Sequence, residues 1–157
     1  MDWNEYFREL AHKVKQKSKD NNTQIGAIIV GPEHEILSTG YNSFPRGIND
    51  NKLERQQRPE KYYWFEHAER NAIYNAARIG VVTKGCTMYL SCGIPCADCA
   101  RGIINSGVAR IVCEKDMKVG ASGLMWEEHA KRSIEMFNEA GVTIEYYGES
   151  DEESNVL

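Results

Sequence analysis

The 157-residue sequence has no long apolar run and no excess of basic charge. Its charged N-terminal segment does not have the apolar stretch of a signal peptide or membrane helix, so we expect a cytoplasmic protein without membrane contacts. The 19 Lys and Arg face 23 Asp and Glu, and four of these acids lie in the last nine residues. The remainder carries no net charge, which is atypical of proteins that bind nucleic-acid backbones. We therefore expect a small-molecule ligand and no polynucleotide.

Cysteine and proline are also scarce, at five and four residues. In a reducing compartment, five cysteines are more often thiols or metal ligands than a disulfide framework. The chain has no internal repeat, and its length is enough to bury one core without disulfides. We predict a single domain over residues 1–148 and an acidic, disordered tail over residues 149–157.

Hydrophobic periodicity predicts helices that alternate with strands along most of the chain. The expected elements are a helix from residue 3 to about 20, strands over 23–30 and 36–41 that form an antiparallel hairpin, a long irregular segment over 42–61, a helix over 66–80, a strand over 86–91, a helix over 95–107, a strand over 110–114, a helix over 126–140 and a strand over 142–147. Helices between the later strands favour parallel pairing, with helices on both faces of one sheet. We therefore predict an α/β fold, a three-layer α-β-α sandwich around one mixed, largely parallel five-stranded sheet.

Two short motifs, HAE and PCADC, contain residue types that bind metals. Each motif lies at the start of a predicted helix, and two such helices packed side by side on a sheet bring their N-termini together. Cys96 and Cys99 are three residues apart, close to one helical turn, so both sulfur atoms can bind a single ion. His67 would supply a third ligand.

Three protein ligands leave one tetrahedral position for water, which is typical of catalytic zinc. Zinc lowers the pKa of such a water to about 7. Glu69, two residues after His67, lies close enough to exchange a proton with this water without binding the metal, so we predict that it is the general base. The pairing of H-x-E with P-C-x-x-C is the signature of zinc-dependent nucleobase deaminases.

The alternative for the main motif is a redox-active or merely packed CxxC, with His67 as a helix cap. That alternative requires four chemically suitable residues to coincide by chance. His12, His34 and His129 lack a Glu two positions later, and we expect them to be solvated or packed. Cys92, just before the PCADC motif, is a further candidate for metal contact.

Beyond the metal motifs, the sequence resembles the deoxycytidylate (dCMP) deaminase family, within the cytidine deaminase-like fold, over nearly its whole length. The resemblance rests on SKDNNTQIGAIIVG, GYNSFPRG, KYYWFEHAERNAIYNAAR, KGCTMYL, PCADCARGIINSG and MFNEAGV, in the order of the family. It implies a hydrolase that converts dCMP to dUMP for thymidylate synthesis. It also implies a homo-oligomer, typically a hexamer, with dCTP as activator and dTTP as inhibitor.

The resemblance also implies substrate contacts. Asn42 would fix the sugar or the base, and the backbone near Ser91 would accept a hydrogen bond from the exocyclic amine. Tyr62, Tyr63 and Trp64 would stack on a base, pack in the core or line a subunit contact.

Two further segments resemble those through which regulated family members hold an effector triphosphate. Lys19 and Arg46 would meet the phosphate charge, and Asp20 would help to position Mg²⁺. Gly47 would let the backbone approach closely, and Asn42 would lie between the effector and substrate sites.

Other functions remain open at this point. The substrate could be another cytosine nucleotide or nucleoside, such as dCTP or deoxycytidine. A tRNA or polynucleotide deaminase would need a basic track, which a pI of 5.6 argues against. Deaminases of riboflavin synthesis share both motifs but usually carry a second domain. A zinc-stabilised binding module would have no use for Glu69 beside an open metal position, and it usually has four protein ligands.

Overall fold

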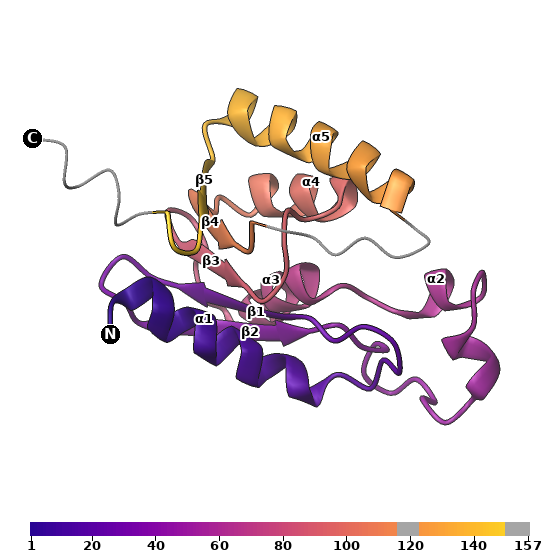
Figure 1. Ribbon diagram of the computed structural model, residues 1–157. Helices are drawn as coiled ribbons and strands as arrows, with labels where there is room; N and C mark the ends of the chain where they lie inside the picture. The colour runs from indigo at the N-terminus through magenta and orange to yellow at the C-terminus, as the bar shows by residue number, and fades with distance from the viewer. Residues whose placement is uncertain (116–122, 150–157) are drawn as a thin grey trace, which may run out of the picture.

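The computed structural model describes residues 1–115 and 123–149, so residues 150–157 of the predicted tail lie outside it. Figure 1 shows the arrangement of the elements. They are α1 (Trp3–Val14), η1 (Lys15–Lys17), β1 (Gly26–Val30), β2 (Ile36–Tyr41), η2 (Leu53–Gln56), α2 (Lys61–Trp64), α3 (Ala68–Ile79), β3 (Thr87–Leu90), α4 (Ala97–Asn105), β4 (Arg110–Cys113), α5 (Gly123–Ala140) and β5 (Thr143–Tyr146). None of the described helices is long and apolar enough to cross a membrane.

The five strands form one sheet in the order β2-β1-β3-β4-β5. Strand β1 pairs antiparallel with β2 and β3, whereas β3, β4 and β5 pair in parallel. The mixed five-stranded sheet is confirmed, but the expectation of a largely parallel one holds for only half of these pairings. A short turn joins β1 to β2 and makes them antiparallel, whereas α4 and α5 provide the longer crossovers that parallel neighbours need.

Helices cover both faces of the sheet, which confirms the three-layer sandwich. Helix α1 covers one face, where Phe7 and Ala11 pack against Ile28 and Tyr89. Helices α3, α4 and α5 cover the other face, and their buried residues join side chains of β1, β3 and β4 in a second core. These apolar contacts fix α3 and α4 side by side.

The first helix and the first strand are shorter than the periodicity predicts. Helix α1 ends at Val14, and after η1 the chain is extended at Ser18, whose hydroxyl donates to the Asn42 carbonyl at 2.7 Å. Strand β1 begins only at Gly26, because the backbone N–H of Ile25 donates to the Asn42 side chain at 2.9 Å. Asn42, which follows β2, therefore sets both boundaries.

Helix α3 lies very close to β2 because Gly40 has no side chain. A Cβ atom at Gly40 would lie 2.4 Å from the Ala68 carbonyl oxygen and 2.3 Å from the Ala72 nitrogen. Only glycine permits this contact, which fixes the height of the first turn of α3 above the sheet. The remaining element boundaries agree with the sequence within a few residues.

The long segment between β2 and α3 extends away from the sandwich and carries η2 and α2 (Figure 1). Its aromatic run does not enter the core of the single chain, since Tyr62 and Tyr63 are 61% and 83% exposed. Trp64 instead stacks under Arg55, whose Cζ lies 3.7 Å from the ring centroid. The sequence left base stacking, core packing or a subunit contact open for these aromatic residues. In the single chain, core packing is excluded for Tyr62 and Tyr63.

Candidate active site

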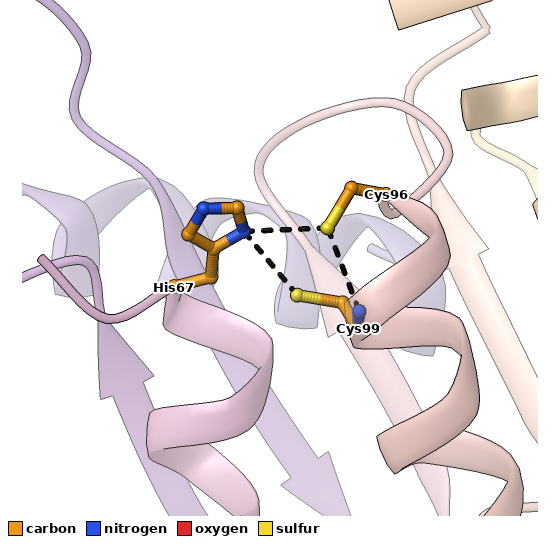
Figure 2. A group of neighbouring side chains, drawn as sticks. All are labelled: His67, Cys96 and Cys99. Carbon is orange, nitrogen blue, oxygen red and sulfur yellow. Dashed lines mark hydrogen bonds between the residues drawn. The ribbon is translucent and has the colours of Figure 1, made fainter. Parts of the chain in front are cut away.

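The two metal-binding motifs lie at helix N-termini, as the sequence predicts. His67 is the N-cap residue of α3 and Cys96 is the N-cap residue of α4. Cys99 lies in the first turn of α4, and its backbone N–H donates to the Cys96 sulfur at 3.5 Å. Figure 2 shows all three side chains directed to the gap between the two helix ends. Packing on one face of the sheet therefore joins motifs that are about thirty residues apart.

The positions of the three side chains fit a tetrahedral zinc ion. His67 Nδ1 lies 3.5 Å from Cys96 Sγ and 3.4 Å from Cys99 Sγ. Tetrahedral zinc with ordinary bond lengths would separate its nitrogen and sulfur ligands by about 3.6 Å. The ligand atoms of His67, Cys96 and Cys99 all lie within 4.8 Å of one another, and no other group of three such ligands is found among the described residues. Cys92, the further candidate, is not part of this group.

The two cysteines share a proton unequally. A hydrogen bond from Cys99 lowers the pKa of the Cys96 thiol to about 4, and the same contact raises the pKa of Cys99. The contact with Cys96 also raises the pKa of His67. Cys96 is therefore the more readily ionised of the two thiols, and metal binding would displace the proton of Cys99.

Glu69 is a buried carboxylate with an unused oxygen. Its side chain projects from the first turn of α3, the residue is 3% exposed, and Oε1 has no hydrogen-bond partner. Among the described residues, it is the one carboxylate with a buried, unpaired atom. Burial raises the pKa of Glu69, against the opposing charge of His67. An oxygen left unpaired at such a cost indicates a partner that arrives with the metal or the substrate.

Arg70 adds a positive charge that the sequence analysis did not anticipate. Its guanidinium lies 2.8 Å from the Glu66 carboxylate. Burial works against the charge, but Cys99 and Glu66 raise the pKa of Arg70 above its ordinary value. An arginine after HAE could be expected to be an exposed helix residue, so only the packing of α3 against α4 identifies it as a neighbour of the metal cysteines.

Asn42, the expected substrate contact, uses its side chain within the protein. Its Nδ2 donates to the Thr23 carbonyl at 2.7 Å and to Asp20 Oδ2 at 3.2 Å, while Oδ1 accepts from Ile25. Both amide protons are therefore occupied, and one lone pair on Oδ1 remains. In this conformation Asn42 holds the loop between α1 and β1.

Ser91 lies at the C-terminal end of β3, four residues before Pro95. Its hydroxyl accepts a hydrogen bond from the Gly26 N–H at 2.9 Å, and its own N–H donates to the Gly26 carbonyl at 3.0 Å. These bonds hold the start of the loop that leads to Cys96. The contact from the nearby backbone to an exocyclic amine stays a prediction.

Three of the predicted effector residues, Lys19, Arg46 and Gly47, lie at the surface. Lys19 forms an ion pair with Asp50, and Arg46 donates to Asn75 Oδ1 at 2.7 Å. Gly47 has a φ of +83°, which favours glycine, with open space where a Cβ would lie. The expected close approach of its backbone to a phosphate stays a prediction. The described contacts do not join Lys19 and Arg46 in one cluster.

Asp20 differs from Lys19, Arg46 and Gly47 because, like Asn42, it is buried and bonded within the protein. It accepts hydrogen bonds from Lys61 Nζ at 2.8 Å and from the Asn22 N–H at 2.8 Å, in addition to Asn42. Burial opposes ionisation, but Lys61 and the backbone N–H groups of Asn22 and Thr23 lower the pKa of Asp20 overall. The expected role of Asp20 in binding Mg²⁺ therefore does not fit this conformation, because Lys61 occupies the place of the cation. Periodicity gave no signal for this lysine.

Comparison with known proteins places the chain in a family. Residues 1–115 match the model of the cytidine and deoxycytidylate deaminase zinc-binding region. The chain belongs to the cytidine and deoxycytidylate deaminase family, an enzyme family, which confirms the resemblance drawn from the sequence. It is 37% identical to the deoxycytidylate deaminase of Homo sapiens over 148 residues, which cover 91% of this chain and 78% of that protein. It is 34% identical to an uncharacterized deaminase of Aliivibrio fischeri over 90% of this chain and 91% of that one.

Solved structures show the same fold. The dCMP deaminase of cyanophage S-TIM5, in complex with dCMP and dUMP, has a TM-score of 0.72 and 22% identity, over 93% of this chain and 98% of that chain. A bifunctional deaminase and reductase from Thermotoga maritima has a TM-score of 0.65 and 21% identity, over 95% of this chain but only 37% of that chain. The cytidine deaminase-like fold is therefore confirmed.

Proposed function

We propose that the protein is a zinc-dependent hydrolase that deaminates dCMP to dUMP and releases ammonia. The observation that carries this proposal is the unpaired Glu69 oxygen beside His67, Cys96 and Cys99. A structural metal site would gain nothing from this buried carboxylate. The preference for dCMP is supported by relatives of that name which span most of the chain.

The zinc ion would be held by His67, Cys96 and Cys99, which provide one nitrogen and two sulfur ligands. A fourth position would be left for water. Zinc in such a site supplies a water molecule of lowered pKa as the nucleophile. The N-termini of α3 and α4 contribute partial positive charge that stabilises the cysteine thiolates.

Glu69 would move the protons of the reaction. Water adds to C4 of cytosine, the bond from C4 to the amine breaks, and a carbonyl forms at C4. One proton of the water ends on N3 and the other on the departing amine, which leaves as ammonia. A buried carboxyl group with a raised pKa suits both steps, because it can accept a proton and release it again.

Two substrate contacts belong to the proposal. The backbone near Ser91 would accept from the exocyclic amine, which would orient C4 at the metal. Asn42 would contact the sugar or base through the remaining lone pair of Oδ1, while its amide protons continue to hold the neighbouring loop.

The regulatory part of the proposal is that dCTP with Mg²⁺ activates the enzyme and dTTP inhibits it. The exposed positions of Lys19 and Arg46 and the positive φ of Gly47 support a triphosphate site on this surface. We also propose a cytoplasmic homohexamer that supplies dUMP for thymidylate synthesis. Saturation curves for dCMP that superimpose with and without each triphosphate would contradict the regulation and leave the deamination intact. Sedimentation would test the hexamer.

The decisive test of the activity measures ammonia release from dCMP, dCTP, deoxycytidine and CMP side by side, together with the zinc content. We expect one zinc per chain and the highest kcat/KM with dCMP. A Cys99→Ala variant should lose both zinc and activity. A protein that holds no zinc, or that releases no ammonia from any of the four compounds, would refute the proposal.

A further inference from the structure

His129 contacts the helix that carries both metal-binding cysteines. The ring lies on α5, and its Nδ1 accepts a hydrogen bond from the Ala97 backbone N–H at 3.1 Å. Ala97 is the first residue of α4 and directly follows Cys96. Figure 1 shows α5 extending alongside α4 on the same side of the sheet. A side chain thirty-two residues away thus binds the peptide group next to a metal ligand.

The first N–H groups of a helix have no partners within the helix. In α4, the N–H of Cys99 donates to the Cys96 sulfur, and the N–H of Ala97 donates to His129. Because Nδ1 acts as the acceptor, the ring is neutral and carries its proton on Nε2. Without this acceptor, the N–H of Ala97, a residue that is 9% exposed, would lose its partner, and the peptide could rotate.

We infer that His129 is a positioning residue for the metal site. By holding the peptide that joins Cys96 to Ala97, it fixes the backbone orientation of Cys96. That orientation keeps the Cys96 sulfur 3.5 Å from His67 Nδ1, close to the separation of about 3.6 Å expected for tetrahedral zinc. His129 acts through the backbone of its neighbour and belongs neither to the ligands nor to the proton-transfer residues. The inference rests on the zinc site of the proposed function.

A merely structural role for His129 would have a different signature. Helix α5 is already anchored by apolar packing, with Phe137 fully buried and Ile134 packed against the same core. If the imidazole only added to this packing, its loss would lower stability without changing metal affinity. Partners that orient metal ligands typically change metal affinity by roughly 10- to 100-fold when they are removed.

The test compares zinc affinity, by competition with a chelator, among the parent and three variants of His129. His129→Asn places an amide oxygen close to the position of Nδ1 and should keep most of the affinity. His129→Gln retains polarity and helix propensity but moves the oxygen one bond further, and His129→Leu removes the acceptor. We expect both to weaken zinc binding by roughly 10- to 100-fold. The matched control is His12→Leu, because His12 also makes one side-chain hydrogen bond but lies on the opposite face of the sheet.

Parent-like zinc affinity in His129→Gln would overturn the inference, as would an equal loss in the Asn and Gln variants. If His129→Leu does not fold, the difference in zinc affinity between His129→Asn and His129→Gln still tests the inference. Cobalt substitution adds a spectroscopic measurement, since the sulfur-to-cobalt absorption bands should change in the Gln variant and not in the control. All these measurements are made without substrate. A parent that binds zinc but does not deaminate dCMP would therefore refute the proposed activity, and the variants would still test His129.

Discussion

Two carboxylates, Glu69 and Asp20, are similarly buried but differ in their hydrogen bonds and in the direction in which their pKa is shifted. The residues are 3% and 7% exposed. Glu69 has an oxygen without a partner, and burial raises its pKa. Asp20 has its oxygens bonded to Lys61, Asn42 and backbone N–H groups, and its pKa is lowered despite burial. Burial alone therefore does not distinguish the two carboxylates. The unpaired oxygen next to the candidate metal ligands is what supports the proposed role of Glu69.

The largest expected effect belongs to Glu69. Glu69→Gln should retain zinc and fold but lower kcat by roughly 10²- to 10⁴-fold, because an amide of the same shape cannot cycle a proton. Steady-state kinetics with dCMP and a zinc assay on the same sample measure both properties. Turnover within a factor of about ten of the parent would remove Glu69 from the proton-transfer role.

The opposite result is expected for the ion pair between Asp20 and Lys61. Its loss should lower the free energy of unfolding more than it lowers turnover. Lys61→Met leaves the Asp20 charge buried without its partner, which should reduce the free energy of unfolding by about 3–5 kcal/mol. The double variant with Asp20→Asn keeps an acceptor for the backbone N–H groups without a buried charge, so it should recover most of this loss. Denaturant unfolding of both variants provides the measurement. If the Lys61→Met variant were as stable as the parent, the ion pair with Lys61 would not be required to stabilise the buried Asp20 charge.

Asn42 allows a finer distinction because it contacts Asp20 and is also a proposed substrate contact. Asn42→Ala removes three hydrogen bonds to the loop between α1 and β1, and we expect a loss of about 1–3 kcal/mol in the free energy of unfolding. Unfolding and KM for dCMP should be measured in parallel. A raised KM with unchanged stability would show that substrate contact is the main role and that the loop does not depend on this side chain.

The smallest effect concerns acid stability. The folded protein lowers the pKa of Asp20, so ionised Asp20 contributes stability above the pKa of an unfolded aspartate, about 3.9. That contribution is lost as the pH falls through the lower pKa of the folded state. Unfolding curves of the parent and of the Lys61→Met, Asp20→Asn double variant should therefore converge as the pH falls below about 4. If the difference in free energy of unfolding between the two proteins stayed constant across this range, the pKa of Asp20 would be the same in the folded and unfolded states.

Helices α3 and α4 were predictable because local rules determine them. Their apolar periodicity, the glycine after α3 and the proline before α4 are short-range signals, and the HAE and PCADC motifs lie where the helices begin. The end of α1 was not predictable in this way. The polar residues after Val14 are compatible with a helix, but Ser18 is extended and its hydroxyl donates to the Asn42 carbonyl, twenty-four positions away. Local propensity gives way where a distant polar group offers the backbone another partner.

The sequence by itself determined the candidate metal ligands His67, Cys96 and Cys99, the candidate proton-transfer residue Glu69, and the order of the main helices and strands, although not η2 and α2. Residue chemistry and short spacing contain that information. Only the tertiary structure decided that Asp20 pairs with Lys61 and that His129 bonds the peptide beside Cys96. Both contacts join residues more than thirty positions apart, and both depend on how packed layers bring side chains together. Hydrogen-bond satisfaction in the interior is a property of that packing, so no local pattern in the chain could predict it.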